Sequence, residues 1–120
     1  MPGTILIAAN DPNIIYLLQR YVEQSGFQAV KVGPGEDVVE LAQQITPTLI
    51  ILESDFPGLV NCEVLRDLKG GPKTREIPVV VYSCLDEEAG RQTKGIAGFL
   101  QKSVRYDDFL AALKQAGVYA

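Results

Sequence analysis

The feature that most constrains the fold is an uninterrupted apolar run that ends at a single carboxylate. The run from Thr48 to Leu52 holds four aliphatic residues in five positions, with Pro47 before it and Pro57 in the loop after it. This pattern is typical of a strand in the middle of a parallel sheet, where both faces are covered. Ligands of such sheets bind at the carboxyl ends of the strands. Glu53 stands at that end, where we expect its charge to leave the core and meet water.

The rest of the chain alternates between strand patterns and helix patterns. Apolar runs predict strands at 4–9, 27–32, 48–52, 78–82 and 96–100, with helices between and after them and the weakest helix pattern at 85–94. Asp11 suits the N-cap of the first helix, and Pro12 suits its first position. Strict alternation favours one α/β domain over residues 1–120, with a five-stranded, doubly wound parallel sheet covered by helices on both faces.

Composition and charge exclude several classes of function. The formal net charge is −4, so nucleic acid and anionic membrane surfaces are not expected partners of this domain. No apolar run approaches the length of a membrane span, and the amino terminus lacks a secretory pattern, so we expect a cytoplasmic protein. The chain has no His, and Cys62 and Cys84 lack metal-ligand spacing. Without His, a nucleophile motif or a metal cluster, we do not expect an enzyme.

Polar residues follow four of the five predicted strands. Asn10 and Asp11 follow the first strand, Glu53 the third, Ser83 the fourth and Lys102 the fifth. Because the carboxyl ends of parallel strands meet at one edge, a carboxylate, a hydroxyl and an ammonium group would converge there. Such a trio can bind a phosphoryl group. Taken singly, Asp11 is most simply a helix cap, Ser83 a turn residue and Lys102 a surface lysine.

Together these residues make the chain resemble the receiver domain of bacterial two-component response regulators. The resemblance covers essentially the whole chain and implies a flavodoxin-like (CheY-like) fold with strand order 2-1-3-4-5. It also implies a role in two-component (phosphorelay) signal transduction. The residues that carry it are Ile5-Leu6-Ile7 before Asp11-Pro12, the stretch 48–58, Glu63-Val64-Leu65-Arg66 with Leu68-Lys69, Ile77-Pro78-Val79-Val80-Val81, and Phe99-Leu100-Gln101-Lys102.

The chain departs from the family at the positions that would hold a metal ion. The family's acidic pair corresponds to Ala9 and Asn10, and its phosphoacceptor aspartate corresponds to Glu53. Mg²⁺ prefers carboxylate and water oxygens in near-octahedral geometry. Because Ala9 supplies no ligand and Asn10 only a neutral carbonyl, we expect no metal and no other cofactor. Asn10 and Glu53 are the weak candidates for any residual Mg²⁺ binding.

The phosphoryl pocket of the family is better retained. By resemblance, Ser83 and Lys102 match its hydroxyl and its lysine, and Phe99 stands at the position of a switch aromatic. Ser103 replaces the proline that usually follows the lysine, which puts the expected cis peptide in doubt. Since Glu53 is longer than the usual aspartate, we predict that it forms an ion pair with Lys102, with a hydrogen bond from Ser83.

The segment between the fourth and fifth strands is short. By resemblance it lacks about three residues, or about one helical turn, so we expect a shortened fourth helix. In the family, the fourth helix, fifth strand and fifth helix often form the dimer or output face. A homodimer through this face is therefore an option, although the face should be reshaped here.

Three hypotheses for function follow from these observations. The first is an atypical receiver, or pseudo-receiver, that binds a protein partner without phosphorylation; the partner would be a histidine kinase, an output domain or another signalling protein. The second is a receiver that a histidine kinase phosphorylates at Glu53 or Asp55. The third is a flavodoxin-like binder of a small ligand, which Ala9-Asn10-Asp11-Pro12 disfavours because this turn is not a phosphate loop.

Overall fold

The computed structural model describes residues 3–33, 38–53, 63–83, 97–101 and 104–118. The predicted fourth helix falls on residues 84–96, which lie outside this part of the chain. No helix in the described ranges is long and apolar enough to cross a membrane. In chain order, the elements are β1 (Thr4–Ala8), α1 (Pro12–Gln24), β2 (Gln28–Val32), α2 (Val38–Ile45), β3 (Leu49–Glu53), α3 (Glu63–Gly70), β4 (Val79–Ser83), β5 (Gly98–Gln101) and α5 (Tyr106–Gln115).

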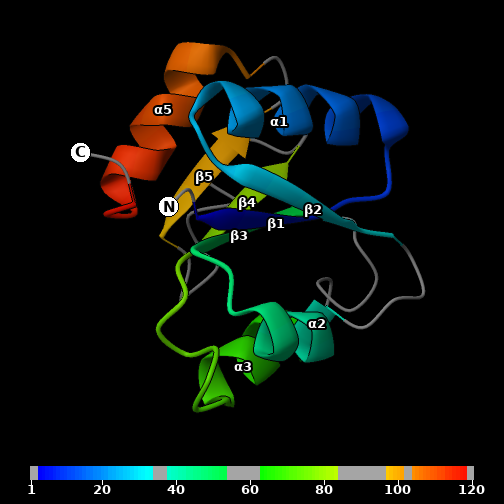
Figure 1. Cartoon of the computed structure of the whole chain (residues 1–120), viewed down its shortest axis with the longest axis vertical. Helices are drawn as coiled ribbons and strands as arrows, with labels where there is room; N and C mark the ends of the chain where they lie inside the picture. Colours follow the sequence, from blue (N-terminus) through cyan, green and yellow to red (C-terminus); the bar gives the residue numbers. More distant parts are fainter. Residues whose placement is uncertain (1–2, 34–37, 54–62, 84–96, 102–103, 119–120) are drawn as a thin grey trace.

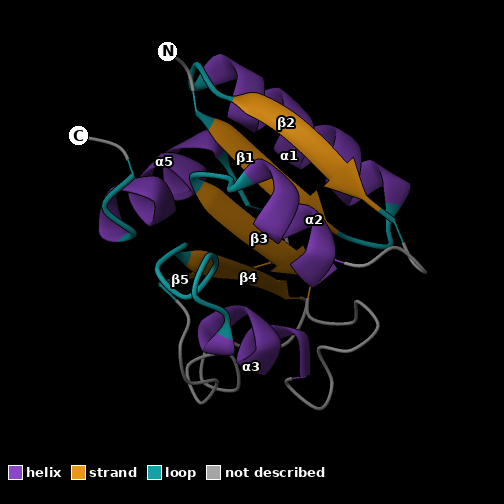
Figure 2. Cartoon of the chain, turned by 60° about the horizontal axis from the view of Figure 1, so that its bottom comes forward, coloured by secondary structure: helices purple, strands orange, loops and turns teal. Residues whose placement is uncertain are grey.

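The strands form one parallel sheet in the order β2-β1-β3-β4-β5 (Figures 1 and 2). The predicted α/β architecture, a parallel sheet covered by helices on both faces, is confirmed (Figure 1). β3 pairs with β1 on one side and β4 on the other, and all of its residues are buried, as the apolar run predicts. The carboxyl end of β3 therefore lies between the ends of its two neighbours.

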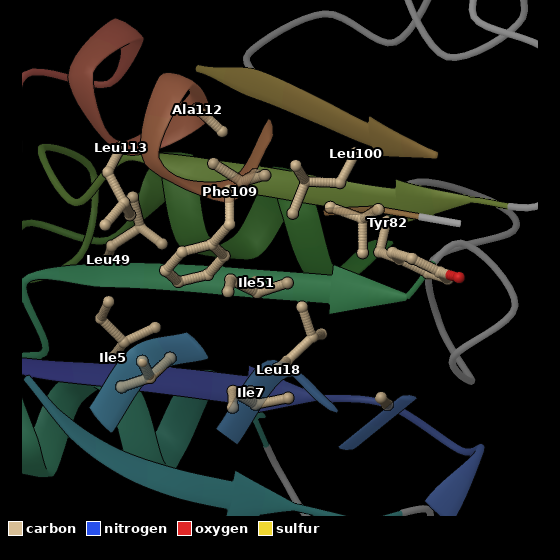
Figure 3. Packing of buried hydrophobic residues seen from close by; sticks show 14 residues of the cluster. Ile5, Ile7, Leu18, Leu49, Ile51, Tyr82, Leu100, Phe109, Ala112 and Leu113 are labelled. Atoms are coloured by element: carbon tan, nitrogen blue, oxygen red, sulfur yellow. The ribbon is translucent and has the colours of Figure 1, made fainter. Parts of the chain in front are cut away.

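Successive residues of the central strands serve opposite faces of the sheet. Ile5 and Ile7 of β1 join the core under α1 and α5, whereas Leu6 and Ala8 join the core under α2 and α3. Figure 1 shows α1 and α5 on one side of the sheet, and α2 and α3 on the other. Figure 3 shows Phe109 of α5 directed at the sheet near Ile51.

The boundaries of some elements differ slightly from the sequence-based prediction. Pro78 was expected to begin a strand, but β4 begins at Val79, since Pro78 has no N–H for the ladder. β5 covers Gly98–Gln101 rather than 96–100. Periodicity locates an apolar run but does not fix the residue at which pairing begins, so shifts of this size are expected.

A tyrosine joins α1 to the segment that precedes α5. The hydroxyl of Tyr21 donates to the main-chain carbonyl of Val104 over 3.1 Å. The ring of Tyr21 also packs against Tyr106 and Phe109, with centroid distances of 5.5 and 5.7 Å. The contact therefore combines apolar packing with a hydrogen bond that fixes the position of α1 relative to the end of the β5–α5 connection.

We predict that Tyr21→Phe lowers the free energy of unfolding by about 1 kcal/mol, because it removes the hydrogen bond to Val104 and keeps the ring contacts. Urea unfolding followed by circular dichroism measures the change. Tyr16→Phe is the matched control, since Tyr16 lies on the same helix but is 62% exposed. Loss of its hydroxyl should change the free energy of unfolding by a few tenths of a kcal/mol at most. Equal effects of the two substitutions would contradict this account.

Candidate functional site

The carboxyl ends of β1 and β3 lie side by side. The register pairs Ala8 with Leu52, so the chain leaves β1 next to the last residue of β3, Glu53. The turn from β1 into α1 therefore passes the side chain of Glu53. This edge is the one at which sequence analysis places the candidate site.

The side chain of Glu53 is bound to the main chain of that turn. Its Oε1 accepts hydrogen bonds from the backbone N–H of Asn10 over 2.6 Å and of Asp11 over 3.2 Å. Only 6% of Glu53 is exposed. The expectation that its charge meets water is therefore wrong: two main-chain donors solvate the carboxylate in place of water, which makes its burial tolerable.

Asp11 connects this contact to the first turn of α1. Its side chain accepts a hydrogen bond from the N–H of Asn13 over 2.9 Å, and its carbonyl accepts from the N–H of Ile15 over 3.0 Å. Asp11 is thus the N-cap, with Pro12 at the first helical position, as predicted. The carboxylate of Glu53 lies at the amino-terminal end of α1, where the helix dipole favours negative charge.

The two positions that correspond by resemblance to the family's acidic pair, Ala9 and Asn10, have different environments. Ala9 is 1% exposed and belongs to the apolar core under α1 and α5. Asn10 is half-buried, and its backbone N–H makes the shorter of the two bonds to Glu53. The interaction uses the main chain at Asn10, so side-chain chemistry alone gives no indication of it.

Several predicted site residues are not placed by the structure. Lys102, Ser103 and Asp55 lie outside the described residues, and for Ser83 and Phe99 only the backbone, in β4 and β5, is described. The ion pair between Glu53 and Lys102 therefore stays a prediction. Sequence reasoning missed the main-chain donors of the β1–α1 turn, because every residue except proline carries an N–H and no residue type marks them.

Comparison with known proteins agrees with this architecture. The family model for the response regulator receiver domain matches residues 5–114. Protein PilH of Pseudomonas aeruginosa is 30% identical over 112 residues, which cover 91% of this chain and 93% of that protein.

Two solved structures share the fold. The chemotaxis response regulator CheY4 of Vibrio cholerae aligns with a TM-score of 0.85 at 16% identity, covering 97% of this chain and 99% of that one. The receiver domain of the sensor histidine kinase PA1611 from Pseudomonas aeruginosa, with a magnesium ion in its active site cleft, aligns with a TM-score of 0.84 at 16% identity, covering 98% and 99%. On the match over residues 5–114, this chain belongs to the family of response regulator receiver domains, the signalling modules of two-component systems.

Proposed function

We propose that this domain acts in two-component signalling as an atypical receiver that recognises a protein partner without being phosphorylated. Receiver domains interact with signalling proteins such as histidine kinases, and the partner here would be a histidine kinase, an output domain or another cytoplasmic signalling protein. The observation that carries the proposal is the pair of hydrogen bonds from Asn10 and Asp11 to the buried carboxylate of Glu53.

The side chains that the described residues place at this edge disfavour a magnesium ion. Mg²⁺ requires several oxygen ligands in near-octahedral geometry, usually from carboxylates and water. The side chain of Ala9 has no donor atom, that of Asn10 offers a neutral amide, and one oxygen of Glu53 already binds two N–H groups. Within the described residues, no group of three or more His, Cys, Asp or Glu side chains could hold a metal ion. Because Ala9 and Asn10 carry no carboxylate, the proposed function includes no metal-dependent step.

The position of the carboxylate also disfavours phosphoryl transfer. Glutamate carries its carboxylate one methylene farther from the backbone than aspartate, or about 1.5 Å. Transfer depends on alignment of the attacking oxygen, and a displacement of about 1 Å can lower the rate about 10²-fold. In addition, Oε1 of Glu53 is directed at the β1–α1 turn, where its lone pairs accept hydrogen bonds.

A phosphate-accepting receiver is the alternative function. Its support is family membership together with the Ser and Lys at positions 83 and 102, which match the phosphoryl pocket by resemblance. Glu53 or Asp55 would be the acceptor. The two functions differ in one measurable property, since only the alternative requires that the edge bind Mg²⁺ and a phosphoryl group.

We predict that amide shifts of Asn10 and Glu53 in ¹⁵N-labelled protein do not change at millimolar Mg²⁺, with or without beryllofluoride, a mimic of the phosphoryl group. The reason is the loss of both carboxylates of the acidic pair. Two-dimensional NMR measures the shifts. Shifts that move and saturate would establish a functional phosphoryl site and overturn the proposed function.

A variant with restored carboxylates is the matched positive control for that titration. Ala9→Asp, Asn10→Asp and Glu53→Asp together return three carboxylates to the edge, and we predict that this variant binds Mg²⁺ in the millimolar range or tighter. The same NMR titration measures the gain. If the triple variant folds and still does not bind Mg²⁺, the missing carboxylates are not the reason why the natural chain fails to bind the ion.

A further inference from the structure

One oxygen of Glu53 joins two parts of the chain that are distant in sequence. The residues it binds, Asn10 and Asp11, are 43 and 42 positions away, and both belong to the turn between β1 and α1. The shorter bond measures 2.6 Å, and hydrogen bonds to an ionised acceptor are generally shorter than those between neutral groups. The end of β3 is therefore attached directly to the β1–α1 turn.

The attachment extends into α1 through Asp11. The N–H of this residue donates to Glu53, its side chain accepts from Asn13, and its carbonyl accepts from Ile15. Asp11 thus joins the end of β3 to the first turn of a helix of 13 residues. A change in the position of the Glu53 carboxylate would therefore act on the N-terminal cap of α1 through Asp11.

The link depends on the length of the glutamate side chain. Pairing of β1 with β3, which includes Ile7 with Ile51 and Ala8 with Leu52, fixes the backbones on both sides of the contact. An aspartate at position 53 would hold its carboxylate about 1.5 Å closer to the backbone of β3. The distance from the carboxylate oxygen to the backbone nitrogen of Asn10 would then rise from 2.6 Å by up to about 1.5 Å, beyond hydrogen-bond length.

We propose that Glu53 is an internal link that holds the β1–α1 turn against β3 and so takes the place of a metal ion at this edge. The N–H groups of the turn bind the negative charge of the Glu53 carboxylate directly. No cation is needed between the β1–α1 turn and the end of β3. The edge consequently keeps one conformation whether or not divalent cations are present. This inference rests on the proposed function in one respect, namely that the edge does not bind Mg²⁺.

Hydrogen exchange of the Asn10 and Asp11 amides tests the link in the absence of any partner. The buffer contains a chelator of divalent cations. The exchange rate of the Ile50 amide in β3 reports global unfolding, and the rates of Asn10 and Asp11 are normalised to it. For Glu53→Asp we predict that both amides exchange at least about tenfold faster than in the natural chain, because both lose their acceptor. Glu53→Gln keeps the length and an acceptor oxygen but loses the charge, so its effect should be intermediate.

Glu76→Asp is the matched control, since Glu76 is an exposed glutamate far from these strand ends in sequence. It should leave both exchange rates within about twofold of the natural chain. If Glu53→Asp also stays within about twofold while the variant remains folded, the link does not exist. Glu53→Gln keeps the test informative if Glu53→Asp does not fold: unchanged exchange in Glu53→Gln would equally overturn the link.

The same samples separate failure of the link from failure of the proposed function. If Mg²⁺ slows exchange at Asn10 and Asp11 in the natural chain, a metal ion binds the edge, and both the proposed function and the link are wrong. If Mg²⁺ has no effect and the Glu53 variants have none either, the link is wrong, and the proposed function loses the support of these hydrogen bonds but keeps that of an edge that binds no metal ion. If Mg²⁺ has no effect and Glu53→Asp accelerates exchange at both amides, the link is supported.

Discussion

The carboxylate of Glu53 accepts two main-chain hydrogen bonds at the edge of a sheet whose central strand is buried on both faces. That burial fixes the backbone of β3, and pairing with β1 fixes the turn that follows Ala8. Because both backbones are fixed, the length of one side chain decides which groups it reaches. The site therefore depends on the core: the apolar strands place a charged group where main-chain donors can bind it.

The architecture could be predicted from the sequence because it depends on patterns that periodicity reports. The run from Thr48 to Leu52 identified a strand buried on both faces, and Asp11 with Pro12 identified the start of a helix. The environment of Glu53 could not be predicted in the same way. Its hydrogen-bond donors are backbone N–H groups. The expectation of a solvent-exposed charge assumed that only side chains or water would bind the carboxylate.

Family membership identifies the class of protein, whereas the residues at the strand ends bear on whether the domain binds a metal ion. The match over residues 5–114 identifies a signalling module of two-component systems. By resemblance, Ala9, Asn10 and Glu53 correspond to the metal-binding positions of the family, and all three lie where β1 and β3 end. A receiver in which a hydrogen-bonded link replaces the metal-binding edge, as we propose here, would present one surface to its partner whether or not divalent cations are present.

A crystal structure of the protein grown in millimolar Mg²⁺ tests the central claim most directly. The account predicts Oε1 of Glu53 within hydrogen-bond distance of the N–H groups of Asn10 and Asp11, with no cation between the ends of β1 and β3. A magnesium ion coordinated by Glu53, with its carboxylate turned away from both N–H groups, would contradict the account.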